Sequence, residues 1–434
     1  MKIIPPLFQF GEKGVYTDIG CSPDFVNKFC EWLHSNVAQI ESVDIALYLF
    51  NNLKLYDALE KINQEGCRIT IYSIPLEGYD REPADVLNIK TGRYSQDSKY
   101  DLAKQIYDKL KVVGNDSFSL RIVPHIFLRS ERIKPFSRGE APYSLHCKTA
   151  CVRFKDGRVY SIITSSNMAV RDAKKHEVAV VSLLNKSEEQ AARDFFCGLY
   201  QHSIPIGEFC NKKEYTDHQA RIRPTPPKSR LMYVAPFYQD SAFIFEDNIC
   251  TVIKKATKRI IVCAQHISAY RYYYPKQFAT PYSKYSNTNF RPGFLSAVLQ
   301  KSEEGIPVTF LSQTYSDALG DHNCPRPENR KAFINFVEEA KKTSCRYFQS
   351  EHVHCKFIVA DDIVIVTTCN FTPTQFIYLP NVKIDSFDEM PNYSYHGTHC
   401  EYGVYQIVQD AALAEAFIEY AEQIAHRKGT RQMF

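Results

Sequence analysis

The sequence predicts an α/β protein of two similar lobes, each a mostly parallel or mixed β-sheet flanked by helices. Apolar runs of strand length alternate with amphipathic helical patterns along most of the chain. The order of these elements in the first half recurs in the second half. A stretch rich in proline and cations, residues 221–230, lies between the halves and is typical of a linker. The expected lobes are therefore residues 1–220 and 231–434, related by pseudo-two-fold symmetry.

The first half is predicted as alternating helices and strands that lead into a hairpin. The elements expected, in order, are a helix at 25–37, a strand at 43–50, a helix at 53–66, a strand at 67–74, a helix near 101–111 and a strand at 118–123. Gly66 should end the second helix, because glycine readily adopts the left-handed conformation that follows a helix C-terminus. The sequence SLHCKTACVRF then begins the hairpin.

The second half repeats this order. Its expected elements are a helix at 246–257, a strand at 259–265, a helix at 294–305, a strand at 306–312, a helix at 330–342 and an apolar hairpin within EHVHCKFIVADDIVIVTTCNFT. A further amphipathic helix, DAALAEAFIEYAEQIAHRK, lies near the C-terminus and is expected to pack on its own lobe.

Composition indicates an ordinary globular protein. Of the 434 residues 44% are hydrophobic and 24% charged, and the formal net charge of +4 permits an anionic partner without requiring one. No apolar run reaches about 18 residues, so we expect a cytoplasmic protein that does not act at a membrane. The 14 cysteines include no C-x-x-C pair, which favours reduced thiols, and neither a metal nor another cofactor is expected.

The tripeptide His-Cys-Lys occurs once in each half, at the start of an apolar strand. It is His146-Cys147-Lys148 in the first half and His354-Cys355-Lys356 in the second. Residues two apart on a strand share a face, so each histidine should point the same way as its lysine while the cysteine faces the core.

Each tripeptide is followed by a second apolar run that ends in a turn of small residues with an asparagine, Asn167 or Asn370. Hairpin turns are expected between the paired runs, at residues 156–157 and 361–362. Carboxylates come next, Glu177 in the first half and Glu401 in the second.

These residues resemble the signature of the phospholipase D superfamily, which is His-x-Lys, four residues, Asp, and then a small-residue turn with Asn. The second half matches with His354, Lys356, Asp361 and Asn370. The first half differs, because Arg153 stands at the Asp position and the interval from His to Asn is 21 residues rather than 16. A longer hairpin accounts for the extra residues.

The resemblance implies a metal-independent phosphodiesterase with one active site shared by both lobes. Two lysines and two asparagine amides would neutralise and orient the phosphate. By resemblance His146 is the nucleophile that forms a phosphohistidine and His354 is the general acid, although pseudo-symmetry also allows the reverse. Glu177 and Glu401 would each fix an imidazole tautomer. Asp361 would support its strand.

Each of these residues also has a purely structural interpretation. A single histidine at a strand start is more often a core or surface group than a catalyst. Asparagine is common in turns, and either glutamate also fits an exposed strand edge. The duplication of the whole set outweighs these interpretations for the histidines, lysines and asparagines.

Two segments rich in cations and aromatic residues favour a nucleic-acid substrate. The cations expected to follow a phosphate backbone are Arg129, Arg132, Lys134 and Arg138 in the first half and Arg271 and Lys276 in the second. The leading hypothesis is a nuclease acting on DNA or RNA. A phospholipase or other small-phosphodiester hydrolase is the alternative, and a binding module without activity is the third. The resemblance also admits a separate ATPase, helicase or other defence-system subunit as partner, and a homodimer is compatible with the sequence.

Overall fold

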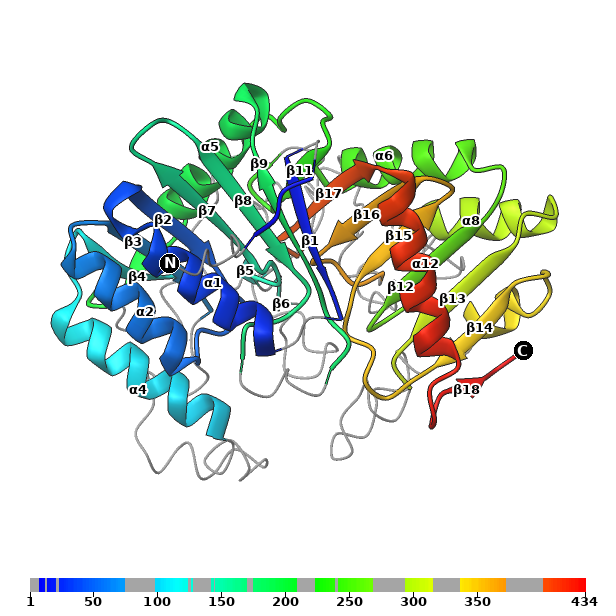
Figure 1. Cartoon of the computed structure of the whole chain (residues 1–434), viewed down its shortest axis with the longest axis horizontal. Coiled ribbons are helices and arrows are strands. Elements are labelled where there is room, and N and C mark those ends of the chain that lie inside the picture. Colours follow the sequence, from blue (N-terminus) through cyan, green and yellow to red (C-terminus); the bar gives the residue numbers. More distant parts are fainter. Residues whose placement is uncertain are drawn as a thin grey trace, which may run out of the picture. The chain divides into compact units, whose positions relative to one another are not determined.

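The computed structural model describes residues 8–11, 14–20, 23–74, 98–123, 126–127, 142–143, 145–169, 175–208, 223–238, 241–267, 293–314, 336–371 and 401–434. The described residues form two compact units. Unit 1 comprises the described residues of 8–127, 142–169 and 178–208, and unit 2 comprises residues 175–177 and the described residues of 223–434. Each unit is an α/β layer built on a sheet of eight strands (Figure 1), which confirms the predicted fold class of two similar lobes.

The sheet of unit 1 is mixed, with only the strands β2, β3 and β4 paired in parallel. In spatial order its strands are β1 (Val15–Ile19), β9 (Val178–Leu183), β8 (Val159–Thr164), β7 (Thr149–Phe154), β2 (Ile40–Ala46), β3 (Arg68–Ser73), β4 (Phe118–Ile122) and β10 (Ile204–Pro205). A separate pair joins β5 (Ile126–Phe127) to β6 (Pro142–Tyr143).

The helices of unit 1 begin and end where local chemistry directs. They are α1 (Pro23–Ser35), the short 3₁₀ helix η1 (Val37–Gln39), α2 (Leu53–Gln64), α4 (Ser98–Val113) and α5 (Lys186–Gln201). The side chain of Asn52 accepts the backbone N–H of Leu55 at the start of α2. Gly66 follows that helix with a φ of 91°, as expected, because this left-handed conformation suits glycine. Asn185 and Glu188 form a reciprocal capping box that starts α5.

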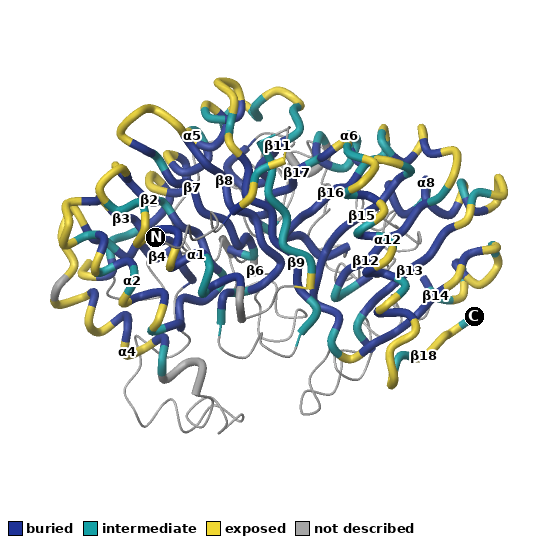
Figure 2. Tube along the Cα trace, in the orientation of Figure 1, coloured by how far each residue is buried: buried dark blue, intermediate teal, exposed yellow. Residues whose placement is uncertain are grey.

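The sheet of unit 2 repeats the design, again with three neighbouring strands, β12, β13 and β14, paired in parallel. In spatial order its strands are β11 (Leu231–Val234), β17 (Gly403–Gln409), β16 (Ile363–Thr367), β15 (Phe357–Ala360), β12 (Ile260–Ala264), β13 (Val308–Ser312), β14 (Arg346–Gln349) and β18 (Arg431–Gln432). Figure 2 shows that the strands of both sheets are mostly buried.

Helices cover both faces of the unit 2 sheet. One face packs against α6 (Ser241–Lys255) and α8 (Gly293–Glu303), with Ile249, Val262 and Phe294 in a common apolar core. The other face carries α12 (Ala411–Ala425), which crosses the strands in Figure 1 and packs Phe417 on Phe357. Among the described helices, none has the length and apolar content needed to cross a membrane.

Two sequence predictions are refined by the structure. Of the two expected sheet types, parallel or mixed, the sheets are mixed, because the predicted hairpins and the outer strands pair antiparallel. The strand expected at 43–50 is wrong in its limits, since β2 is Ile40–Ala46. Leu49 and Phe50 are buried but belong to the connection that leads into α2. An apolar run signals burial and does not by itself distinguish a strand from a packed connection.

Both predicted hairpins form, and the first is the longer one. β7 and β8 span residues 149–164, whereas β15 and β16 span residues 357–367. Gly157 has a φ of 88° in the first turn, and Asp361 has a φ of 54° in the second. The longer hairpin explains why the His-to-Asn interval is greater in the first half.

Asp361 organises the loop that precedes β12. Its carboxylate accepts the backbone N–H groups of Thr257 and Lys258, both at 2.8 Å, and that of Arg259 at 3.0 Å. Burial alone would raise the pKa of Asp361, but these three hydrogen bonds hold it below its ordinary value. At the matching position of unit 1, Arg153 instead forms an ion pair with Glu189 at 2.8 Å.

We expect Asp361→Ala to lower the free energy of unfolding by about 1 kcal/mol, because three backbone N–H groups, exposed or part-buried, lose their acceptor. The difference from wild type should be full at neutral pH and shrink as the pH falls through about 4, because the depressed native pKa adds stability only where the carboxylate is ionised. Thermal melting between pH 3 and 7 measures this. Asp361→Asn keeps one oxygen acceptor, so its Tm at neutral pH should lie between those of wild type and Asp361→Ala. An equal Tm for all three proteins would contradict the account.

Candidate active-site residues

The two His-Cys-Lys tripeptides have the same local structure. Each precedes the first strand of a hairpin, and each lysine folds back so that its Nζ donates to the carbonyl oxygen of the histidine two residues earlier. The distance is 2.8 Å from Lys148 to His146 and 2.6 Å from Lys356 to His354. Both lysines are 0% exposed. The cysteine between them is also buried in each case, on the core side as expected.

The asparagines follow the second strand of each hairpin by three positions, Asn167 after β8 and Asn370 after β16. Asn370 is buried and Asn167 is half-buried. The same backbone hydrogen bond between the hairpin strands precedes both turns. It runs from Thr164 N to Lys148 O in unit 1 and from Thr367 N to Lys356 O in unit 2, each at 3.1 Å. The fold therefore keeps each asparagine turn close to the start of its own hairpin.

Glu177 forms the bond that the sequence predicted for a tautomer-fixing carboxylate. Its Oε1 lies 2.6 Å from Nδ1 of His354, and both side chains are buried. Two backbone bonds hold the segment in place, from His176 N to His352 O at 2.8 Å and from His354 N to His176 O at 3.2 Å. Residues 175–177 thus pack as part of unit 2, although β9 of unit 1 follows them in the sequence. When Nδ1 donates to the carboxylate, Nε2 is the nitrogen left for chemistry.

Glu401 does not occupy the strand position that matches Glu177. In each unit the last threonine of the hairpin donates its hydroxyl to a valine carbonyl, that of Val178 in unit 1 and that of Val404 in unit 2. By this register Gly403 matches Glu177, and Glu401 lies two residues earlier. Glu401 is half-buried, and its role as an imidazole partner stays a prediction.

His146 has a different electrostatic setting from His354. Nζ of Lys148 lies 3.3 Å from Nε2 of His146, and the ring of Tyr48 meets the imidazole edge-on with centroids 6.0 Å apart. An ammonium group is only a donor, so this contact requires an unprotonated Nε2. The arrangement therefore favours a neutral His146 with its lone pair on Nε2.

A third histidine, His266, lies beside the site residues of unit 2, and the sequence reasoning missed it. Its backbone N–H donates to Oδ1 of Asn370 at 3.4 Å, and its carbonyl accepts the N–H of Phe371 at 2.9 Å. It follows β12 by two residues. Strand register places Leu49 at the matching position of unit 1. A single histidine after a strand matches no sequence motif. The sequence signal that could have pointed to His266 is its position just after a predicted strand, where ligands bind in many α/β folds.

The charge state of His266 is set by its neighbours. Burial, followed by the positive charges of Lys356 and Lys175, lowers the pKa of His266 to about 3. Its imidazole is therefore neutral at physiological pH and offers one N–H donor and one lone pair.

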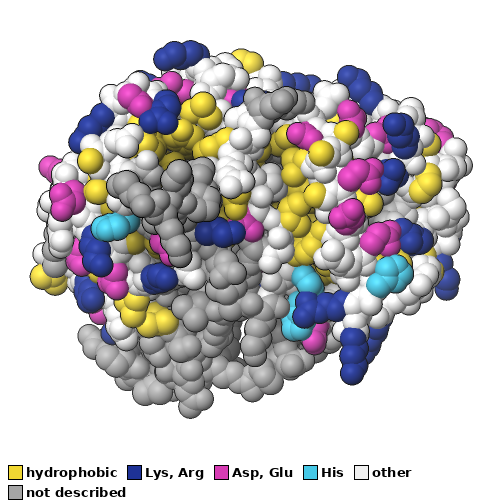
Figure 3. All heavy atoms as spheres, viewed as in Figure 1, with side chains coloured by type: hydrophobic (Ala, Val, Ile, Leu, Met, Phe, Trp, Pro, Cys, Tyr) yellow, Lys and Arg dark blue, Asp and Glu magenta, His cyan; other side chains and the backbone are white. Residues whose placement is uncertain are grey.

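The predicted nucleic-acid-binding cations lie outside the described residues. These are Arg129, Arg132, Lys134, Arg138, Arg271 and Lys276. On the face shown in Figure 3, the described surface carries cations and anions interspersed. The described part of that face thus offers no large patch of one charge to steer an anionic ligand.

Comparison of sequences identifies no relative. No protein-family model matches the chain, and no curated protein sequence matches it either.

Solved structures do match the fold. Phosphatidylserine synthase from Haemophilus influenzae Rd KW20 aligns with a TM-score of 0.55 and 12% identity, covering 98% of this chain and 89% of that one. Polyphosphate kinase from Porphyromonas gingivalis aligns with a TM-score of 0.51 and 10% identity over 96% of this chain. The present chain spans about half of that kinase, 48% of its length. At these identities the likeness concerns the fold alone.

The titration of His266 is directly measurable. We expect its imidazole ¹H and ¹³C NMR shifts to stay constant from pH 8 down to about 5, since its pKa lies near 3. A titration midpoint for His266 above about pH 5 would show that its nitrogens are solvated and would contradict the lowered pKa.

Proposed function

We propose that the chain is a metal-independent phosphodiesterase that cleaves DNA or RNA through a phosphohistidine intermediate. The phospholipase D-like fold supports this proposal. His146, Lys148 and Asn167 of unit 1 and His354, Lys356 and Asn370 of unit 2 would act together on one phosphate. Glu177 would support His354. The proposal has a reaction part, supported by the geometry within each unit, and a substrate part, supported by sequence.

The observation that carries the reaction part is the repeated lysine loop. In each unit a fully buried ammonium group is tied to the carbonyl of the histidine two residues before it. Burying an ammonium group costs several kcal/mol unless charge or hydrogen bonds compensate it. We interpret the two buried lysines, each beside a histidine and an asparagine turn, as two half-sites for an anion. A phosphodiester is an anion that needs such neutralisation before a nucleophile attacks it.

The settings of the two histidines support different roles. A neutral His146, with its lone pair directed at Lys148, has the protonation state of a nucleophile. The carboxylate of Glu177 on Nδ1 of His354 stabilises an imidazolium, which a general acid requires before it donates. This asymmetry favours His146 as nucleophile over the reverse assignment.

The proposed reaction has two balanced steps. First, Nε2 of His146 forms a bond to phosphorus, the bond from phosphorus to the leaving oxygen breaks, and Nε2 of His354 gives that oxygen a proton. Next, His354 takes a proton from water, the water oxygen bonds to phosphorus, and the phosphorus–nitrogen bond breaks to restore neutral His146. The lysines and asparagines would hold the phosphoryl oxygens through both steps.

The substrate part depends on two cation-rich, aromatic segments. Their cations, Arg129 to Arg138 in one segment and Arg271 and Lys276 in the other, suit a nucleic-acid backbone, and the interleaved tyrosines suit stacked bases. The proposed location is the cytoplasm, and a separate ATPase or helicase subunit would supply any motor function.

Cleavage assays in excess EDTA test both parts. We expect wild-type protein to cleave labelled DNA or RNA in EDTA, and His146→Asn and His354→Asn each to lose at least about 10³-fold in rate, because each removes a group that makes or breaks a bond. His34→Asn and His426→Asn, which alter exposed histidines of units 1 and 2, are the matched controls and should keep full activity.

Other outcomes overturn one part or the other. Loss of all cleavage in EDTA would contradict the metal-independent reaction. Cleavage of phosphatidylcholine without cleavage of nucleic acid would remove the nuclease assignment and leave a lipid phosphodiesterase. Activity that survives both histidine replacements would contradict the proposed mechanism.

The role of Glu177 has its own signature. Glu177→Gln should lower the cleavage rate of a nucleic-acid substrate by about 10–100-fold, as loss of a carboxylate behind a reacting imidazole does. The same variant should cleave bis(p-nitrophenyl) phosphate with a loss of only a few-fold, because a nitrophenolate leaves without a proton. Glu415→Gln on the exposed side of α12 is the control. Equal losses on both substrates would indicate that Glu177 only maintains structure.

A further inference from the structure

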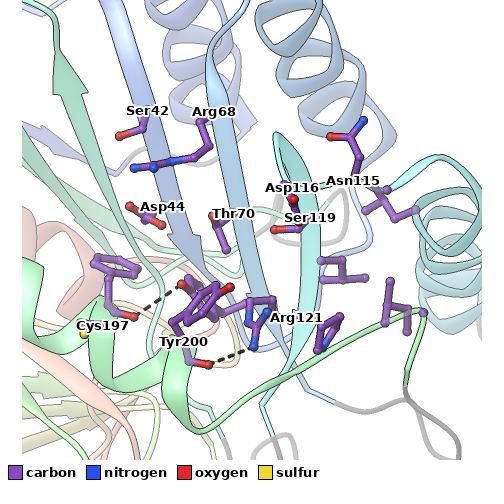
Figure 4. A pocket seen from close by; sticks show the side chains of 18 of the residues that line it. Ser42, Asp44, Arg68, Thr70, Asn115, Asp116, Ser119, Arg121, Cys197 and Tyr200 are labelled. Carbon is purple, nitrogen blue, oxygen red and sulfur yellow. Dashed lines mark hydrogen bonds between the residues drawn. The ribbon is translucent and has the colours of Figure 1, made fainter.

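Unit 1 contains a polar cavity on the side of its sheet that faces α5, away from the residues assigned to the proposed reaction. Its volume is about 1000 Å³. The floor comes from β7, β2, β3 and β4, and one wall comes from α5, with Phe196 and Tyr200 among its lining residues. Figure 4 shows Asp44, Arg68 and Thr70 side by side on this floor. The size is at the upper end of small-molecule binding sites.

One row of paired residues crosses the floor. Strand register aligns Cys151 with Asp44, Asp44 with Thr70, and Thr70 with Ser119. All four line the cavity. The row is short-chained and polar, with a single carboxylate near its centre.

Unit 2 provides an internal comparison, because larger side chains occupy most of the same row of strand positions there. The matching residues are Val359, Ile261, Thr309 and Arg346. Val359 and Ile261 are buried. Arg346 reaches across the row, donating to Oγ1 of Thr309 at 3.0 Å and to Glu422 of α12 at 2.8 Å. The shared architecture therefore does not require a polar floor, and unit 1 has replaced packing side chains with small or polar ones.

Asp44 is the residue whose position is hardest to explain as structure. Burial raises its pKa to about 6, against the opposing effects of Arg68, Thr70 and Arg153. In the part of the chain that the structure describes, Thr70 donates a hydrogen bond to it and no cation lies within ion-pair distance. Isoleucine at the matching position of unit 2 avoids this penalty. A carboxylate retained at such a position is typical of a ligand contact.

The arginines near Asp44 differ in whether other residues of the protein already bind their guanidinium groups. Arg121 donates to the carbonyls of Tyr200 and Ser203 and stacks on the ring of Tyr200. Arg153 is paired with Glu189. Arg68 is exposed at the edge of the floor next to Asp44, where its guanidinium is accessible to a ligand.

We propose that this cavity binds a guanine nucleotide, with Asp44 accepting the N–H groups of the base and Arg68, beside Asp44, donating to the O6 oxygen on the same edge. A carboxylate is acceptor-only and has two oxygens, which suits the adjacent N1–H and N2–H donors on one edge of guanine. Adenine presents a ring-nitrogen acceptor on that edge and would meet Asp44 with repulsion. The guanidinium of Arg68 offers N–H donors that suit the O6 oxygen of guanine. The proposal is independent of the proposed phosphodiesterase activity.

Isothermal titration calorimetry with guanosine monophosphate tests the site on the full chain. Wild type should bind it saturably with a Kd below about 1 mM. Asp44→Asn should weaken binding at least about 10-fold, because one acceptor becomes a donor that faces the base donors. Arg68→Gln should also weaken binding, and adenosine monophosphate should bind wild type at least about 10-fold more weakly.

Controls separate binding from folding. Asp44→Asn should melt at or above the wild-type temperature at pH 7.5, because it removes a carboxylate that burial penalises. Asp57→Asn, on the exposed surface of α2, should bind guanosine monophosphate as wild type does. Absence of saturable binding up to about 10 mM, an unchanged Kd for Asp44→Asn, or equal binding of the adenine nucleotide would each overturn the proposal.

Discussion

Two ammonium groups without exposed surface impose the constraint that organises both units. Lys148 and Lys356 each donate to the histidine carbonyl two residues before them, and this bond fixes the backbone between histidine and lysine. The same local loop therefore recurs in both units and holds the histidine and the lysine of each motif close together.

The two units share one fold but differ in the residues around their motifs. The strand order, the hairpins and the lysine loops recur, while the residues that surround them differ. Unit 2 has Asp361 in its hairpin turn and His266 after β12, where unit 1 has Arg153 and Leu49. Unit 1 in turn has Asp44 where unit 2 has Ile261. Such differences within a duplicated frame indicate where each unit has acquired its own chemistry, because the shared fold does not require them.

Sequence patterns predicted the fold class and the local structure of the motifs because both depend on short-range periodicity. The hairpin at Asp156 and Gly157 and the end of α2 at Gly66 follow from turn and cap chemistry that acts within a few residues. The bond between Glu177 and His354 was predicted in kind, although the partner histidine was not specified.

Other features depend on long-range packing that no local pattern records. Leu49 and Phe50 have the composition of a strand and lie in a buried connection. The strand position of Glu401 relative to Glu177 depends on which valine each threonine contacts. The cavity beside Asp44 depends on which part of the sheet α5 leaves uncovered. The pKa of His266 is lowered by burial, and then by Lys356 and Lys175, which are distant in sequence.

The claim that the two histidines serve one reaction is tested most directly by comparing single and double variants. The first-order rate of phosphodiester cleavage would be measured for His146→Asn, His354→Asn and the protein carrying both changes. Groups that act as a unit are non-additive, so each single variant should be as inactive as the double variant. Single variants that each retain about half of the wild-type rate, with activity lost only in the double variant, would show two independent sites and contradict the account.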